Sequence, residues 1–410
     1  MADWAGIQFI EDIVTSIDPS TQQISLHKYS NGSTNLCLKY DILSIDIGST
    51  SRGLHVIPGV KKHTIPTRPI SNLLDKIQEE EEIIVKMKES KDVNWKKKVN
   101  LVVIGAGLAG IELALVMRER WKKILQDDVF ETTILNSGRG LIPNESEWCR
   151  DALKHILKER NIKIQHNCNV ESIDEDMIHL INGEHIPYTH CLWATGAEPH
   201  QLAWELDRKG IAVNQNGWIR VGPTLQTVSH PNVFAAGDCA SIESANFETP
   251  PKAGVYAVRS GPILIENISK TLEDLDDCKS LVSYQPQDDF LKLITCGDGT
   301  ALGFRFGIPL EGKWVWQMKD RIDQMFMDLF QVEHLPVLDE DHGSYNTSQY
   351  DERTTRPEPL KPEEAKELLL RKDDNVDYER AWDVIRDMMD DEKYKEKVLD
   401  HAYLTKKCSV

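Results

Sequence analysis

The chain contains the stretch Val102-Val103-Ile104-Gly105-Ala106-Gly107-Leu108-Ala109-Gly110, in which an apolar strand runs into a glycine-rich turn and a helix. Its three glycines have the spacing GxGxxG. The first glycine of such a motif allows the tight turn, the second lets the backbone approach a pyrophosphate, and the third lets the helix pack close to the strand. The diphosphate then lies on the free N–H groups and the positive end of the helix dipole. Because the turn stands between a buried strand at 99–104 and an amphipathic helix at about 108–121, we predict that Gly105, Gly107 and Gly110 bind a nucleotide.

The residues that follow this turn alternate between strand and helix patterns. A strand at 131–135, a helix at 147–159 and a strand at 162–165 come first. A hairpin turning at Asn182-Gly183 and a strand at 191–195 complete the pattern. This alternation predicts a complete small α/β domain from Val99 to Ala197.

Asn136 follows the second strand, at the position that normally contacts the adenosine ribose. An acid there binds the 2′-hydroxyl of NAD, whereas a nearby arginine accommodates the 2′-phosphate of NADP. This chain has Asn136-Ser137-Gly138-Arg139 instead. Asn and Ser can hydrogen-bond to either nucleotide and Arg139 can pair with a 2′-phosphate, so both remain open. Glu112 has two equally supported interpretations, a carboxylate near the nicotinamide or an ordinary helix-start acid stabilised by the dipole.

A long-range repeat is the second informative feature. In both copies a tyrosine precedes a glycine by eight residues, as Tyr40 precedes Gly48 and Tyr188 precedes Gly196. The copies also share an apolar pattern before that tyrosine, namely Val14-Thr15-Ser16-Ile17-Asp18 with Ile24 and Leu26, and Val170-Glu171-Ser172-Ile173-Asp174 with Ile178 and Leu180. Such self-similarity predicts a duplicated unit. Only the second copy has a glycine turn before it, so the chain carries one and a half copies of a dinucleotide-binding unit.

Other segments have clear local patterns. The first fifty residues are predicted to be β-rich, with strands at 9–17, 23–28 and 41–47 and a turn at Asn31-Gly32. The remaining predictions are a charged helix at 71–91, a buried strand before Gly237-Asp238, strands within 288–307, and helices at 252–268 and 314–330.

Composition excludes several classes of function. The chain has 410 residues, of which 40% are hydrophobic and 28% charged, which is typical of a soluble protein with two or three domains. Its net charge of −18 argues against a nucleic-acid surface and against peripheral contact with anionic lipid. No apolar run approaches the roughly 20 residues of a membrane span. The first residues lack the features of a secretory signal, so we expect a cytoplasmic protein, with a mitochondrial one as the open alternative.

The cysteines form no motif. The eight cysteines lie at positions 37, 149, 168, 191, 239, 278, 296 and 408, and none of them forms a CxxC or CxxxxC spacing. This spacing predicts no zinc site or disulfide scaffold, and it provides no adjacent thiol pair for a disulfide reductase.

Composition changes at residue 332. The segment 332–410 holds 21 acidic and 13 basic residues. A helix near 378–399 places Ala381, Val384, Ile385, Met388 and Met389 on one face, which predicts an appended helix against the body of the protein. Its acidic face argues against a membrane anchor.

Taken together, these motifs resemble the flavoproteins with two dinucleotide-binding domains. The resemblance is to the type II NADH dehydrogenase-like members, including the flavoprotein module sometimes fused to selenide water dikinase. It covers roughly residues 5–331. The matching residues are Tyr40-Asp41, Ile45-Asp46-Ile47-Gly48-Ser49, the glycine turn with Glu112, Ala194-Thr195-Gly196, Asn232 to Ala240, Pro250 to Arg259 and Trp316 to Asp323.

The resemblance implies an α/β fold in which an FAD domain (1–62 and 199–331) is interrupted by an NAD(P)H domain (63–198) and followed by the acidic tail (332–410). It also implies that Asp238 accepts hydrogen bonds from the FAD ribityl chain and that Gly237 allows its close approach. Gly48 and Ser49 would lie where the chain of the first FAD-domain segment (1–62) passes near the flavin. The start of the helix that carries Lys252 and Ala253 would lie beside the isoalloxazine. Gly196, Asn136 and Glu112 are carried over as further cofactor-binding residues.

The implied chemistry is hydride transfer from NAD(P)H to FAD and then onward to an acceptor, in which the flavin performs the redox step. Such a transfer requires no general base, so no catalytic side chain is assigned. Without a redox cysteine pair, the expected acceptor is quinone-like or another diffusible small molecule. A homodimer is compatible with this pattern.

The chain departs from the family by lacking the first strand, turn and helix that clamp the FAD diphosphate, and no dikinase domain follows. The sequence is therefore either an incomplete chain or one with a degraded FAD domain. Two alternatives follow from this departure: a nicotinamide-binding module without flavin that acts as a redox-responsive interaction protein, and an inert truncated product.

Overall fold

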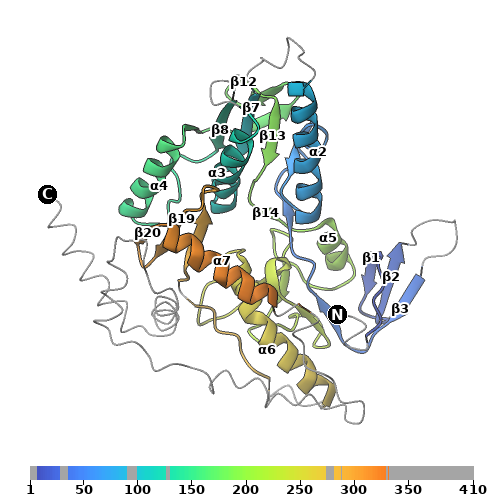
Figure 1. The fold of residues 1–410 in the computed structure, drawn as a ribbon. Coiled ribbons are helices and arrows are strands. Elements are labelled where there is room, and N and C mark those ends of the chain that lie inside the picture. The colour runs from blue at the N-terminus through green and yellow to red at the C-terminus, as the bar shows by residue number, and fades with distance from the viewer. Residues whose placement is uncertain are drawn as a thin grey trace, which may run out of the picture. The chain divides into compact units, whose positions relative to one another are not determined.

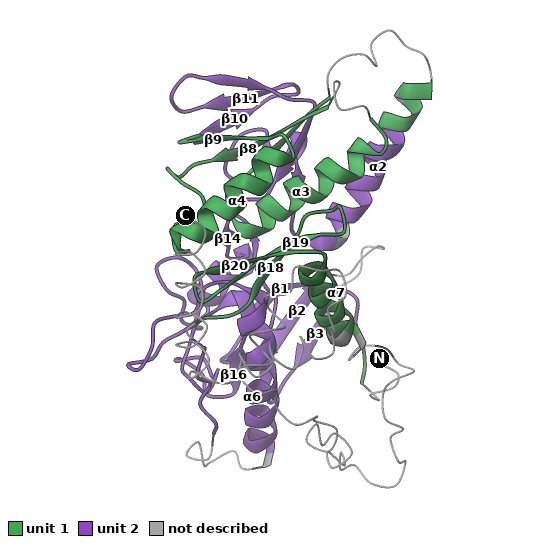
Figure 2. Cartoon of the chain, turned by 60° about the vertical axis from the view of Figure 1, so that its left-hand side comes forward, with its two compact units in different colours: residues 1–8, 84–168, 289–410 green, residues 9–83, 169–288 purple. Residues whose placement is uncertain are grey.

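The computed structural model describes residues 7–27, 36–89, 99–125, 130–273, 281–287, 289–328 and 331. The chain folds into two compact units (Figure 2). Unit 1 comprises residues 1–8, 84–168 and 289–410, and unit 2 comprises residues 9–83 and 169–288. The predicted acidic tail with its helix near 378–399 and the predicted turn at Asn31-Gly32 lie outside the described residues. The division into an FAD domain and an NAD(P)H domain stays a prediction.

Unit 1 is built on parallel strands with helices packed against them. β7 (Val99–Ile104), β8 (Phe130–Asn136) and β9 (Ile162–His166) pair side by side in parallel. α3 (Leu108–Lys122) and α4 (Glu147–Glu159) run beside these strands (Figure 1). The second half of β7 is fully apolar and buried, as expected for a parallel strand that is covered on both faces. The βαβ unit predicted around the glycine turn is confirmed.

The second part of unit 1 is a small antiparallel sheet with one helix. It contains β18 (Lys292–Thr295), β19 (Ala301–Arg305), β20 (Ile308–Gly312) and α7 (Lys313–Asp328). Val315 and Met318 of α7 pack on Ala301 of the sheet. The helix predicted at 314–330 and the strands predicted within 288–307 are thus confirmed, with a third strand added by residues 308–312.

Unit 2 contains the repeat that the sequence predicts. Its two copies are three-stranded antiparallel sheets, one of β1 (Ile13–Asp18), β2 (Gln23–His27) and β3 (Leu36–Lys39), the other of β10 (Val170–Ile173), β11 (Met177–Leu180) and β12 (His185–Pro187). The register shifts between Val14 and Ser16 in one copy and between Val170 and Ser172 in the other. An irregularity at equivalent positions supports a duplicated unit. The first strand begins at Ile13, four residues later than predicted.

Short parallel strands complete unit 2. β4 (Leu43–Ile45) pairs with β16 (Val233–Ala235), and β13 (His190–Trp193) pairs with β6 (Ile65–Pro66). Among the described residues, β4 and β16 make a sheet of two strands. β16 is fully buried and leads into a single 3-10 turn, η3 (Gly237–Cys239). This turn carries Asp238 at the end of a parallel strand, where α/β folds commonly place their binding sites.

The other elements of unit 2 surround this turn and the repeat. The strand after η3, β17 (Ala240–Ile242), pairs in parallel with β15 (Ile219–Val221), and β14 (Ala197–Glu198) pairs with β5 (Thr50–Ser51). Within its described residues, this unit wholly contains the helices α1 (Val60–His63), α5 (Gln201–Arg208) and α6 (Gly254–Glu273). α2 (Ile70–Glu89) begins here, and its last residues belong to unit 1. The helices predicted at 71–91 and 252–268 are confirmed.

Asn267 of α6 holds the segment 281–287 in place. Its amide Nδ2 donates to the carbonyls of Thr224 (2.9 Å) and Val282 (2.8 Å), and its Oδ1 accepts from the Val282 N–H at 2.7 Å. The Asn267 side chain is completely buried, so water cannot supply these hydrogen bonds if the amide is removed. It thereby fixes the segment that carries Tyr284, a residue of the candidate site.

We expect Asn267→Ala to lower the free energy of unfolding by about 2–4 kcal/mol, because it leaves buried polar groups without partners. Urea denaturation measures this change. Ser269→Ala, at an exposed position of the same helix, serves as the control and should change stability by less than about 0.5 kcal/mol. A similar small effect of both substitutions would show that Asn267 does not hold the segment.

In the part of the chain that the structure describes, no helix is long and apolar enough to cross a membrane.

Candidate functional site

Asp238 is the centre of the predicted residues in unit 2. Its carboxylate Oδ2 accepts a hydrogen bond from the Ser49 hydroxyl at 2.8 Å, although the two residues are 189 positions apart in the sequence. They meet because β4 and β16 are parallel neighbours, so both strands end at the same edge of the sheet. Gly48, beside Ser49, has a φ of 65°, and no atom lies within 4 Å of where a Cβ would stand. The structure thus brings Gly48, Ser49, Gly237 and Asp238 together.

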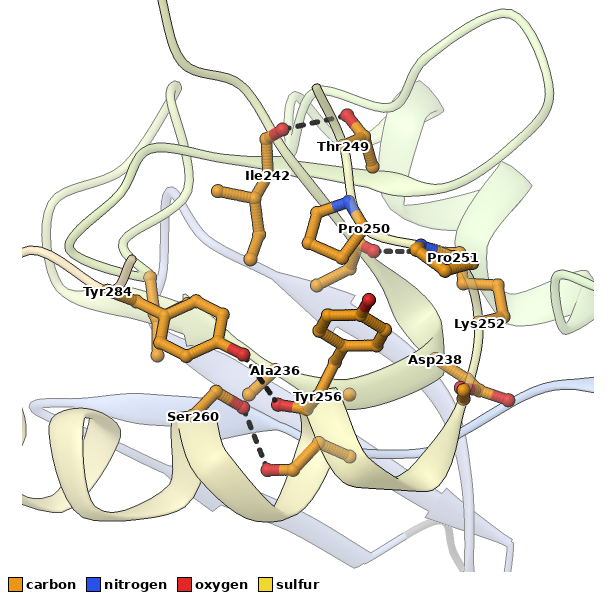
Figure 3. A pocket seen from close by; sticks show the side chains of 15 residues that line it. Ala236, Asp238, Ile242, Thr249, Pro250, Pro251, Lys252, Tyr256, Ser260 and Tyr284 are labelled. Carbon is orange, nitrogen blue, oxygen red and sulfur yellow. Dashed lines mark hydrogen bonds between the residues drawn. The ribbon is translucent and has the colours of Figure 1, made fainter. Parts of the chain in front are cut away.

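A hollow of about 370 Å³, which includes the part open to solvent, lies beside Asp238 (Figure 3). We call it the Asp238 hollow. In Figure 3 Tyr256 lies at its centre, Tyr284 on the left and Asp238 at the right-hand edge. Its lining is Leu225, Ala236, Gly237, Asp238, Ala240, Ile242, Thr249, Pro250, Pro251, Lys252, Ala253, Tyr256, Ala257, Ser260 and Tyr284. The predicted residues Lys252 and Ala253 therefore share this wall with Gly237 and Asp238.

Lys252 is held inside the wall of the Asp238 hollow. Its ammonium donates to the Ala240 carbonyl and lies 4.4 Å from the centre of the Trp218 ring. Burial lowers the pKa of Lys252, while the Asp238 carboxylate acts in the opposite direction. The Ala240 carbonyl and the Trp218 ring thus hold the end of the Lys252 side chain near the start of α6.

Cys239 is adjacent to Asp238 in the sequence, but its thiol is poorly reactive. Its thiol donates to the carbonyls of Ile45 and Ala236, each at 3.1 Å. Burial raises the pKa of this thiol to about 11, so it is protonated at neutral pH. Because the thiolate is the reactive form, Cys239 is poorly suited to pass electrons to a disulfide.

Arg68 also lies beside Asp238, although no sequence motif predicts it. Its Nη2 lies 3.8 Å from Asp238 Oδ2. Its Nη1 is buried and has no hydrogen-bond partner in the described part of the chain. Buried donors are nearly always paired, so this atom suggests a missing acceptor such as an anionic ligand. No local motif marks Arg68, because its position depends on the path of the chain between β6 and α2.

Gly196 lies at the end of the second copy of the repeat, just after β13, and does not line the Asp238 hollow. Its carbonyl accepts from the Arg52 N–H at 2.8 Å, and the neighbouring Thr195 hydroxyl donates to the Arg52 carbonyl at 2.6 Å. Gly196 thus tethers the strand end of the second copy to the residues just after Gly48 and Ser49.

The glycine turn in unit 1 keeps an open cradle. Gly105 has a φ of 116°, which side-chain-bearing residues rarely adopt, and its N–H donates to the Leu135 carbonyl at 2.9 Å. Gly107 caps α3 without a side-chain hydrogen bond, and no atom lies within 4 Å of where its Cβ would be. Gly110 is buried within α3. The free helix N-terminus and the open space at Gly107 fit the phosphates of a nucleotide.

Glu112 binds to the second part of unit 1. Its Oε1 accepts from the Thr295 N–H at 3.0 Å and lies 3.8 Å from the Lys319 ammonium. It is the fifth residue of α3, one turn past the positions at which a helix-start acid acts. Its carboxylate therefore connects α3 to β18 and α7, and a role toward nicotinamide stays a prediction.

The effect of pH on Glu112 can be tested. Burial raises the pKa of the Glu112 carboxyl above its ordinary 4.5, although Thr295 and Lys319 act in the opposite direction. The folded protein then holds this proton more tightly than the unfolded chain, so this contribution to stability is lost as pH rises from 4.5 through the raised value. We expect Glu112→Gln to be more stable than the wild type at pH 8 and to lose that advantage at pH 4. Urea unfolding at both pH values measures this, and a pH-independent difference would contradict the assignment.

Asn136 lies at the end of β8, as predicted, but its side-chain amide is hydrogen-bonded within the protein. Nδ2 donates to the Gly140 carbonyl at 3.0 Å and lies 3.0 Å from His166 Nδ1, while Oδ1 accepts from the Gly138 N–H at 3.1 Å. The side chain is buried, whereas residues 137–140 are exposed. Asn136 thus shapes the loop that follows β8.

The site contains no evident metal centre. Among the residues that the structure describes, no group of three or more His, Cys, Asp or Glu side chains is arranged to hold a metal ion. Cys37, Cys149, Cys168, Cys191, Cys239 and Cys296 are free thiols.

The fold and these two groups of residues define an α/β protein with parallel sheets, a nucleotide-type glycine turn and a duplicated unit. The chain belongs to the pyridine nucleotide-disulphide oxidoreductase family, whose model matches residues 4–261. This family is FAD-dependent and binds NAD(P)H.

Two curated relatives illustrate the level of similarity. A probable NADH dehydrogenase of Dictyostelium discoideum is 26% identical over 265 residues, which cover 60% of this chain and 56% of that protein. A type II NADH:quinone oxidoreductase of Haemophilus influenzae is 25% identical over 230 residues, or 53% and 50% of the two chains. The chain thus spans about half the length of the curated relatives it matches.

Among solved structures, NDH2 from Plasmodium falciparum in complex with NADH has a similar fold. The TM-score is 0.66 at 16% sequence identity, and the match covers 80% of this chain and 85% of that chain. The predicted α/β fold with parallel sheets, like that of flavoreductases with two dinucleotide domains, is therefore confirmed.

Proposed function

We propose that this protein is an FAD-dependent NAD(P)H oxidoreductase that passes electrons to a quinone-like or other diffusible acceptor. In this proposal, residues 1–62 and 199–331 contribute to the flavin side and residues 63–198 to the nicotinamide side. The observation that carries it is the Asp238 group: a carboxylate bound by Ser49, beside Arg68 with its buried unpaired Nη1. Family membership and the names of relatives such as the NADH:quinone oxidoreductase support the same reaction class.

The residues of the Asp238 hollow fit one end of a flavin. Asp238 offers an acceptor for hydroxyl groups of a ribityl chain, and Gly237 leaves its backbone open to close approach, with a φ of 69°. Arg68 and Lys252 supply positive charge toward phosphate or an electron-rich ring. FAD, when bound, would accept the hydride of NAD(P)H, while these side chains orient it and balance its charge.

The choice of acceptor rests on four buried thiols of the described residues. Burial raises the pKa of Cys149, Cys191, Cys239 and Cys296, so these thiols are protonated at neutral pH. A dithiol relay is therefore not favoured, and we propose a small diffusible acceptor.

A second candidate function is a nicotinamide-binding module without flavin. The observation that favours it is a contrast within the described residues: the strand, glycine turn and helix from β7 to α3 are complete, whereas β4 and β16 form a sheet of two strands. In this case the Gly105–Gly110 turn would bind the nucleotide, and the protein would respond to redox state by binding rather than by catalysis.

One experiment separates these functions. Freshly purified full-length protein is examined for flavin absorbance, then mixed anaerobically with NADH or NADPH. The oxidoreductase predicts flavin bands, present as purified or after addition of FAD, that bleach with the nicotinamide and recover with a soluble quinone. Protein that quenches nicotinamide fluorescence but retains no flavin supports the binding module. Flavin that does not bleach would overturn the proposed oxidoreductase.

A further inference from the structure

The loop at residues 137–140, which we call the β8 loop, follows the strand end at which dinucleotide-binding folds contact the adenosine ribose of NADH or NADPH. Sites for NADH commonly present a carboxylate that accepts from the ribose 2′-hydroxyl, and sites for NADPH an arginine for the 2′-phosphate. The residue at the strand end is Asn136, and both of its amide protons and its carbonyl oxygen are already hydrogen-bonded to Gly140, His166 and Gly138. Its buried amide is thus committed to the loop and is not offered to a ribose.

The exposed groups on the β8 loop are donors. Ser137 and Arg139 are its two residues other than glycine, and the loop contains no acid. Arg139 is exposed and makes no ion pair with any residue that the structure describes. An arginine without a carboxylate partner is suited to a phosphate, because its guanidinium presents several N–H donors in one plane.

His166 adds another donor at the same edge. Both protons of the Asn136 amide point to acceptors, so His166 Nδ1 accepts and the ring carries its proton on Nε2. The imidazole belongs to β9, the parallel neighbour of β8, and its side chain is exposed. The edge of the sheet at Asn136 therefore displays a guanidinium, a hydroxyl and an imidazole N–H.

We propose that the β8 loop binds the 2′-phosphate of NADPH through Arg139 and that the protein uses NADPH in preference to NADH. This inference rests on the proposed function only in that the nucleotide occupies the Gly105–Gly110 turn. It deepens that function by naming the substrate, and it holds whether or not flavin is bound.

The test compares nucleotide binding by the full-length chain. NADPH and NADH are titrated by their fluorescence, and adenosine 2′,5′-bisphosphate and ADP are then used as competitors that carry no nicotinamide. We expect the 2′-phosphorylated member of each pair to bind at least about tenfold more tightly. Arg139→Ala should remove about tenfold of the affinity for NADPH and leave NADH within about twofold. Arg139→Lys should keep part of the affinity for NADPH that Arg139→Ala loses, because lysine retains the positive charge but not the planar set of N–H donors.

Lys158→Ala is the matched control, since Lys158 is an exposed cation of the same unit on α4, away from the loop. It should change neither affinity. Equal affinity of the wild type for both nucleotides, a preference for NADH, or an equal loss of both affinities in Arg139→Ala would overturn the inference while leaving the proposed oxidoreductase intact. A wild type that binds neither nucleotide would overturn both.

Discussion

Gly107→Ala is expected to lower the affinity for NADH and NADPH on the order of 100-fold without unfolding the protein. The added methyl group would stand where the backbone must approach the pyrophosphate. Losing two charge-assisted hydrogen bonds of about 1.5 kcal/mol each corresponds to a fold-change of this size. The fold should tolerate the substitution, because Gly107 has a φ of −70° and no atom lies within 4 Å of the new Cβ. Fluorescence titration measures the affinity, and thermal melting measures the stability.

Gly222→Ala provides the control for Gly107→Ala. Gly222 also has no atom within 4 Å of a Cβ position, but it belongs to unit 2, whereas the glycine turn belongs to unit 1. It should leave both affinity and melting temperature unchanged. Unaltered nucleotide affinity in Gly107→Ala would mean that the turn does not bind the pyrophosphate, and the nicotinamide site would then have to be sought elsewhere.

Asp238→Ala is expected to reduce the amount of bound flavin to about a tenth or less. The substitution removes the carboxylate that we assign to the ribityl chain and leaves the Arg68 guanidinium without the charge 3.8 Å away. Asp238→Asn keeps an acceptor oxygen and should retain more flavin than the alanine variant. Flavin content per protein is read from absorbance after purification or after titration with FAD.

The effect of Asp238→Ala on stability should be small, because the side chain is partly exposed and loses one hydrogen bond, to Ser49. Glu248→Gln is the control, since Glu248 is an exposed acid just before the lining residues Thr249 and Pro250. It should bind flavin like the wild type. Full flavin content in both Asp238 variants would contradict the placement of a flavin at the Asp238 hollow.

Much of the fold was predictable from local pattern. The unit from β7 to β8 follows from an apolar run, a GxGxxG turn and helical periodicity, which depend only on neighbouring residues. The repeat was recognisable for the same reason, and its two hairpins contain matching register shifts. The start of β1 was predicted four residues early because alternation from Phe9 to Asp12 resembles a strand whether or not another strand pairs with it.

The sequence by itself determined the class of protein, because strand and helix periods and glycine spacing are properties of adjacent residues. Tertiary structure alone decided which side chains meet. Ser49 and Arg68 reach Asp238 because folding brings them to one strand edge, and Asn136 turns inward because Gly138, Gly140 and His166 surround it. Ser49 and Asp238 are 189 positions apart in the sequence, so the path of the whole chain selects this pair and no local pattern encodes it.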